Sequence, residues 1–183
     1  MDKRKWTLFG LVGPLAAYFF IGVSIILSPW FSWWSNALSD LGHSADSGVA
    51  SLYNFGLLLA GFFMIVYSIT AFRGHAKCTS YCLLMSAFIL QLVATFDEVY
   101  GPLHVRVSIL FFVSLGFASI VYAVERKSIL ALVAFVIGLV SWILYSAGIY
   151  RAGVAVPEII SSTVTVLWIM LSAFKIYIGK PNS

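Results

Sequence analysis

The sequence predicts an all-α polytopic membrane protein, a bundle of six transmembrane helices with both termini in the cytoplasm. Hydrophobic residues make up 61% of the chain, whereas about 45–50% is usual for a soluble domain. Charged residues make up only 10%, which is too little to cover the water-facing surface of a soluble domain of this size. The mean hydropathy is +0.99, and the apolar runs lack the alternation of membrane barrel strands. The chain is therefore expected to fold in a bilayer as helices.

Six apolar runs are each about 20 residues long, the length that crosses the hydrocarbon core of a bilayer. The predicted helices cover about 6–28, 51–72, 78–96, 105–124, 128–149 and 157–178. The first run is longer than the apolar part of a signal peptide, so we expect this helix to be retained. The six spans leave no room for a separate soluble domain. Residues 1–183 are therefore expected to form a single transmembrane domain.

The basic residues predict the orientation, because Lys and Arg favour the cytoplasmic side of a membrane. With the N-terminus inside, the inner segments hold Lys3, Arg4, Lys5, Arg73, Lys77, Arg126, Lys127, Lys175 and Lys180. Only Arg106 and Arg151 fall outside. Most acidic residues show the opposite distribution and fall on the outer side: Asp40, Asp46, Asp97, Glu98 and Glu158. We therefore expect a multi-pass protein of the cell membrane with its acidic groups gathered at the outer interface.

The longest connection, about 29–50, begins with tryptophans and a phenylalanine that are typical of membrane-interface anchors. Ser32 or Ser35 can cap a short helix that Gly42 ends. Three polar residues then share one face of this helix: Asn36, Ser39 and Asp40. We predict a short interfacial helix within this loop, although its polar face can simply meet water.

The connection between the third and fourth helices carries a second polar group. Asp97 and Glu98 stand at the C-terminal end of a helix, where the helix dipole disfavours negative charge. They are either a solvated acidic pair or need a partner, for which the candidates are Arg106, Arg151 and His104. His104 and Ser108 lie one turn apart on the same helix face.

Polar residues inside the spans need hydrogen-bond partners and usually face the bundle interior. Asn54 lies less than one turn from the outer boundary, so we expect it to join the polar groups of the loops. Gln91 is interpreted as a contact between helices. Glu158 follows Pro157 and suits the N-terminus of the last helix.

Three segments of the chain resemble a prokaryotic membrane family known as domain of unknown function 998. They are Asn-Ala-Leu-Ser-Asp-Leu-Gly at 36–42, Tyr-Asn-Phe-Gly-Leu-Leu-Leu-Ala-Gly at 53–61 and Gly-Pro-Leu-His-Val-Arg-Val-Ser at 101–108. The resemblance covers essentially the whole chain and implies a six-helix bundle, without implying an activity. The family is also distantly similar to the eukaryotic Frag1/DRAM/Sfk1 group, six-helix proteins linked to glycolipid remodelling, lipid asymmetry and autophagy. The family pattern carries over to Ser39, Asp40, Gly42, Asn54, His104 and Ser108, whereas His43 has no counterpart in it.

The first functional hypothesis is a protein that binds or handles a lipid or isoprenoid headgroup in an outward-facing pocket. Arg106 or Arg151 would hold a phosphate, and the aromatic residues would line the tail. Membrane lipids are the expected partners, and nucleic acid is not. The predicted ligand-binding residues are Asn36, Ser39, Asp40, His43, Asn54, Asp97, Glu98, His104, Arg106, Ser108 and Arg151.

The second hypothesis is a metal-dependent intramembrane hydrolase. Nitrogen and oxygen ligands of the kind that zinc accepts are available in His43, His104, Asp40 and Asp97. The arrangement loosely resembles the alkaline ceramidase and adiponectin-receptor superfamily, which uses seven helices and three histidines, but the late histidine pair of that superfamily is missing here. A metal-free version would use His104 as the general base, oriented by Asp97 or Asp40. The cofactor is then either zinc or none.

The third hypothesis is a small-molecule transporter. The two halves of the chain show no internal repeat, and no charged residue lies at mid-membrane, which argues against coupling to ions or protons. The sequence alone leaves open which ligand is bound, whether the protein is an enzyme and how many copies assemble.

Overall fold

The computed structural model describes residues 3–149 and 151–179, and these residues form helices and connections without a strand. The long helices are α2 (Phe9–Ile26), α3 (Ala50–Thr70), α4 (Lys77–Thr95), α5 (Pro102–Arg126), α6 (Ile129–Ser146) and α7 (Ala155–Ile178). The short elements are α1 (Lys3–Thr7) and three 3-10 helices, η1 (Leu38–Gly42), η2 (Phe72–Gly74) and η3 (Glu98–Tyr100). Lys180, one of the basic residues used to predict the orientation, lies outside the described residues.

Six helices in the described part of the chain are long and apolar enough to cross a membrane, which confirms the predicted multi-pass helical class. The first span begins at Lys5 in α1 and continues to the end of α2. The α5 helix is longer at both ends than the predicted 105–124. It starts at Pro102, whose fixed φ suits a first helical turn, and it ends before Lys127, which adopts a left-handed conformation with φ +50° that typically terminates a helix.

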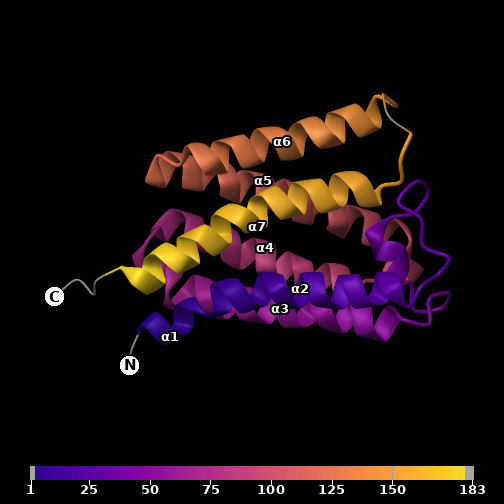
Figure 1. Ribbon diagram of the computed structural model, residues 1–183, viewed down its shortest axis with the longest axis horizontal. Coiled ribbons are helices and arrows are strands. Elements are labelled where there is room, and N and C mark those ends of the chain that lie inside the picture. The colour runs from indigo at the N-terminus through magenta and orange to yellow at the C-terminus, as the bar shows by residue number, and fades with distance from the viewer. Residues whose placement is uncertain (1–2, 150, 180–183) are drawn as a thin grey trace.

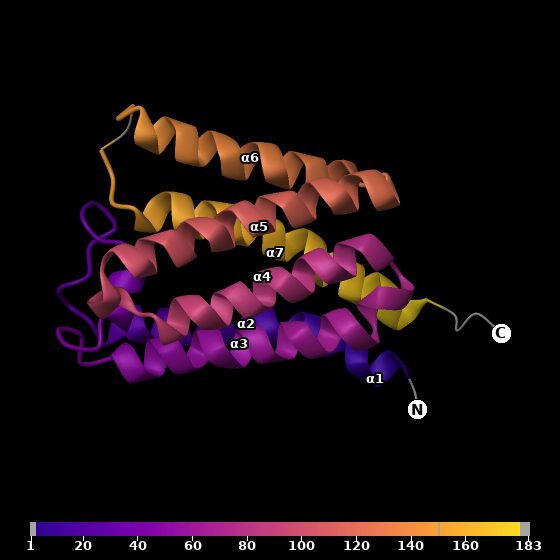
Figure 2. The same cartoon turned by 180° about the vertical axis from the view of Figure 1, so that it is seen from behind.

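By their packing, five of the six long helices form a ring, and α6 lies outside it. Figures 1 and 2 show α6 at the edge of the bundle. Within the ring, α2, α3, α4 and α5 pack in chain order, each extensively on the next. The α7 helix closes the ring with looser packing on α2 and α5. The α6 helix packs on α5 and α7 and covers their seam from outside. Polar side chains add contacts between neighbouring helices. The Gln91 amide on α4 donates a hydrogen bond to the Leu58 carbonyl on α3 over 3.3 Å. Gln91 therefore forms a contact between helices, as predicted.

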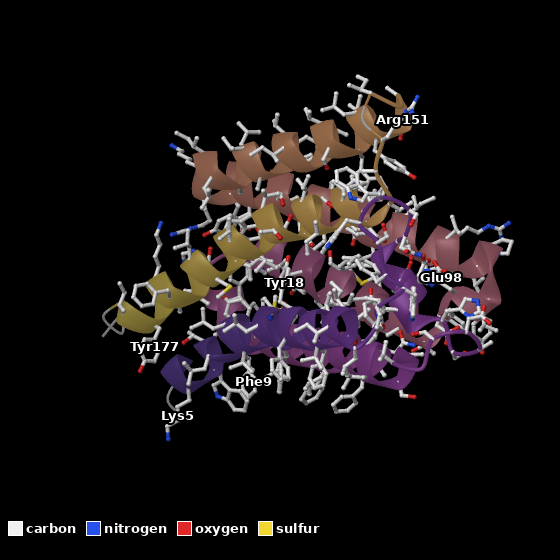
Figure 3. All side chains as sticks on the ribbon, turned by 45° about the vertical axis from the view of Figure 1, so that its right-hand side comes forward. Lys5, Phe9, Tyr18, Glu98, Arg151 and Tyr177 are labelled. Atoms are coloured by element: carbon white, nitrogen blue, oxygen red, sulfur yellow. The ribbon has the colours of Figure 1, made fainter. Side chains whose placement is uncertain are left out.

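The two ends of the bundle differ in composition. One, which we call the termini end, holds Lys5 and Tyr177 (Figure 3). The other, the loop end, holds the connection from α2 to α3 and the connection from α6 to α7 (Figure 1). At the termini end, the Glu125 carboxylate of α5 accepts hydrogen bonds from the backbone N–H groups of Cys78 and Thr79. A carboxylate at this position accepts from N–H groups of the first turn of α4 that have no partner within the helix. Its negative charge also interacts favourably with the dipole of α4.

Buried apolar side chains form two clusters, one toward each end of the bundle. The cluster toward the termini end includes Met64 and Trp168, and the cluster toward the loop end includes Leu38 and Tyr53. Side chains of both clusters line a central cavity of about 130 Å³. The ring of helices thus encloses space at the junction of its two cores.

Candidate functional site

A short helical turn closes the loop end of the ring. This turn, η1, is a single 3-10 turn whose Leu38, Ser39, Leu41 and Gly42 are buried, and we call it the roof. It is shorter than the interfacial helix predicted from Ser32 or Ser35. The reason is local: the Asp40 carboxylate accepts hydrogen bonds from the Ala37 N–H over 3.1 Å and the Asn36 amide over 2.6 Å. These side-chain hydrogen bonds take the place of the backbone hydrogen bonds of a longer helix, which is a common effect of Asn and Asp.

Three hydrogen bonds fix the roof to the helices below it. The Leu38 N–H donates to the Glu158 carboxylate of α7 over 2.7 Å. The Ser39 hydroxyl donates to the Glu98 carboxylate of η3 over 2.8 Å. The Asn54 amide of α3 donates to the Gly42 carbonyl over 2.8 Å, so Asn54 joins the loop as predicted. The roof is therefore held from three sides by side chains that lie far apart in the sequence.

The segment that leads into the roof is also fixed by its backbone. The Gly153 N–H donates to the Trp33 carbonyl over 2.9 Å, and the Ala155 N–H donates to the Asn36 carbonyl over 3.0 Å. A Cβ on Gly153 would lie 2.3 Å from the Asn36 oxygen, so this close approach requires glycine. The connection from α6 to α7 and the connection from α2 to α3 thus form one joined structure.

The central cavity lies directly beneath the roof. Its walls are mostly apolar side chains of α2, α3, α4, α5 and α7, such as Leu57, Leu90 and Phe111. At the loop end its lining becomes polar, through Ser39, Tyr53, Ser108 and Glu158. Its volume of about 130 Å³ is close to that of an engineered apolar cavity, roughly 150 Å³, that binds benzene. The cavity can therefore hold a ring-sized apolar group with a polar atom at the roof.

His104 connects the cavity lining to η3. Its Nδ1 lies 2.7 Å from the Phe96 carbonyl oxygen, and a carbonyl only accepts, so this contact assigns the ring hydrogen to Nδ1. Its Nε2 lies 3.2 Å from the Ser108 hydroxyl and 3.8 Å from the Glu98 carboxylate. The predicted pair of His104 and Ser108 therefore forms. A backbone carbonyl orients His104 where the sequence predicted Asp97 or Asp40, and the ring can accept the Ser108 proton.

On the outer side of the roof lies a second, open depression of about 240 Å³, which we call the acidic depression. It is lined by Trp30, Asp40, His43, Asp46 and Glu98. His43 and Asp46 are 3.3 Å apart there. The pKa of the Glu98 carboxyl is raised, mainly because the group is partly buried and also because Asp40 lies beside it. The hydrogen bond from Ser39 partly offsets this rise. The roof thus separates a charged depression from an apolar cavity.

Three predicted site residues lie apart from this arrangement. The Asp97 carboxylate is buried and accepts from the Val99 N–H over 3.0 Å, so it caps η3. Arg106 and Arg151 are exposed, and no ion pair with a carboxylate is found for either among the described residues. Figure 3 shows Arg151 well away from Glu98. The described residues also contain no group of three His, Cys, Asp or Glu placed to hold a metal ion.

Two residues of the site were missed from the sequence. Glu158 was interpreted as an ordinary acidic residue of a helix start, and Tyr53 was not considered. The available signal was that Glu158 lies within an apolar span, where an ionisable residue is a functional candidate by default. For Tyr53 the available signal was its place at the start of the family-like segment 53–61, directly before Asn54.

Comparison with known proteins places the chain within one family. A family model described as "Protein of unknown function (DUF998)" matches residues 11–175. No curated protein and no solved structure matches the chain. The similarity to the Frag1/DRAM/Sfk1 group stays a prediction.

Proposed function

This chain belongs to the DUF998 family, whose function is unknown. From the geometry of its own site, we propose that it binds a membrane amphiphile. The apolar part of the amphiphile occupies the central cavity, and its polar head lies under the roof. This proposal keeps the predicted lipid or isoprenoid class of ligand. It places the ligand beneath the roof, away from Arg106 and Arg151.

The observation that carries the proposal is the division of the cavity lining. Ligand sites are typically apolar pockets with a few converging polar groups that fix the orientation of the ligand. Here Ser39, Tyr53, Ser108 and Glu158 lie at the loop end, and the wall beyond them is mostly apolar. The polar residues in that wall include Ser86, Ser162 and Thr165, whose hydroxyls donate to backbone carbonyls of their own helices. A membrane amphiphile likewise has a polar head at one end and an apolar body along the rest of its length.

The seam between α2 and α7 is the place where a ligand from the bilayer would enter the ring. This seam is loosely packed and, unlike the seam between α5 and α7, is not covered by α6. The Tyr18 hydroxyl on α2 lies within hydrogen-bond distance of Ser162 and Thr163 on α7, and Tyr18 also lines the cavity. Figure 3 shows Tyr18 between these two helices. An acyl or isoprenoid chain longer than the cavity would have to break these hydrogen bonds to leave the ring at this seam.

We also propose the orientation predicted from the basic residues, with both termini cytoplasmic. The support is the excess of Lys and Arg in the segments of the termini end. In this orientation the roof and the acidic depression face outward, and the polar head of the ligand lies near the outer interface.

Filling the cavity tests the proposal. Val166 of α7 lines the cavity, so Val166→Phe places a ring inside it. The matched control is Val136→Phe, because Val136 on α6 is exposed and faces lipid in a membrane. We expect the amount of co-purified amphiphile per protein, measured by mass spectrometry of extracts, to fall about tenfold in Val166→Phe, equivalent to roughly 1.4 kcal/mol of binding free energy. Equal retention by the wild type and both variants would refute the proposal.

A further inference from the structure

Among the described residues, no Lys or Arg lies within ion-pair distance of the loop-end carboxylates, whose only ion-pair contacts are with histidine rings. His43 lies 3.3 Å from Asp46, and His104 lies 3.8 Å from Glu98. Glu158 is 8% exposed and forms no ion pair among the described residues. Its Oε2 accepts from the Leu38 N–H, and no described group donates to its Oε1. A buried carboxylate with a free oxygen is expensive unless a cation or a proton compensates it.

Tyr53 provides an independent indication of a missing ligand group. The side chain is 5% exposed and lines the central cavity at its polar end. No described residue makes a hydrogen bond with its hydroxyl. The charges that act on this hydroxyl are those of Glu158, Glu98 and Asp40. Tyr53 and Glu158 both line the polar end of the cavity, so the position under the roof is suited to a ligand atom that meets both.

From these groups we infer that the polar head is a protonated primary amine, joined directly to a hydrocarbon body. This inference rests on the proposed function and names its class of ligand. An ammonium group has three donors and no acceptor. When Glu158 is ionised it supplies the opposite charge, and the Tyr53 hydroxyl supplies a second acceptor. A phosphate head is disfavoured at this position, because Asp40, Glu98 and Glu158 repel a second anion.

Three probes with the same chain separate the charge of the head from the apolar contacts: dodecylamine, dodecanol and dodecyl phosphate. Their binding is measured by native mass spectrometry on the full chain in phosphatidylcholine nanodiscs at neutral pH. The variants are Glu158→Gln, whose amide oxygen still accepts from the Leu38 N–H, and Val166→Phe, which fills the cavity. We expect the wild type to bind dodecylamine at least about tenfold more tightly than dodecanol, since hydrogen bonds to charged groups are the stronger ones.

In Glu158→Gln the preference for the amine should disappear, so that dodecylamine and dodecanol bind with similar dissociation constants. In Val166→Phe the binding of both probes should be lost. If the wild type binds dodecanol as tightly as dodecylamine, or dodecyl phosphate most tightly, and Val166→Phe still abolishes binding, the amine head is refuted and the proposed function stands. If Val166→Phe binds every probe as the wild type does, the cavity is not the binding site and both proposals fail.

Discussion

Replacing Glu158 with alanine should release the roof. The substitution removes the acceptor of the buried Leu38 N–H, which now lies 2.7 Å from the carboxylate. Leaving a buried N–H group without an acceptor costs about 1–3 kcal/mol. We therefore expect the Leu38 amide to exchange with deuterium about 10- to 100-fold faster in Glu158→Ala than in the wild type, if exchange follows local opening.

A local readout is needed because global stability combines two opposite effects. Losing the hydrogen bond destabilises the fold, whereas losing a buried carboxylate also removes its desolvation penalty. The control is Glu158→Gln, which keeps an acceptor at the same position and should keep the Leu38 amide protected. Unchanged protection in Glu158→Ala would show that Glu158 does not hold the roof.

Replacing Gly153 with alanine should separate the two connections of the loop end. The new Cβ would lie 2.3 Å from the oxygen and 2.7 Å from the nitrogen of Asn36, and both are backbone atoms that a side-chain rotation cannot move away. Overpacking of this kind typically costs about 1–3 kcal/mol. We expect the melting temperature in detergent to fall by roughly 2–12 °C, from the usual 2–4 °C per kcal/mol for a chain of this size.

The matched control for this prediction is Gly48→Ala, in the connection from α2 to α3 at the same end of the bundle. A Cβ at Gly48 meets nothing within 4 Å, so its melting temperature should stay close to that of the wild type. If Gly153→Ala has the same melting temperature as Gly48→Ala and the wild type, the close approach between Gly153 and Asn36 does not exist in solution.

The spans could be predicted from the sequence, because the length of an apolar run and the charges at its ends are local properties. The pairing of Asn54 with the loop was predictable for a similar reason, since a polar side chain near the end of a span needs a partner close by. The roof was not predictable in its observed form. The segment that leads into it pairs through Trp33 and Asn36 with Gly153 and Ala155, more than a hundred residues away in the sequence. No periodicity within the loop indicates such a contact.

The role of Glu158 was hidden because a local explanation was sufficient. An acidic residue after a proline suits the start of a helix, so its position needed no distant partner. The contact with the Leu38 N–H and the cavity beside it depend on how α7 closes the ring. Arg106 and Arg151 show the converse case, since their expected pairing with Asp97 or Glu98 followed from charge alone. In the structure Asp97 instead caps its own turn, and the His104 ring lies 3.8 Å from the Glu98 carboxylate.

The most direct test of the central claim is photo-crosslinking with an alkylamine that carries a diazirine in its chain. The labelled protein is digested and the modified residues are identified by mass spectrometry. We predict adducts on residues that line the central cavity, such as Leu57, Leu90 and Phe111, and their loss in Val166→Phe. Adducts confined to outward-facing residues of α6, such as Leu139 and Ile143, would contradict an amphiphile site inside the ring.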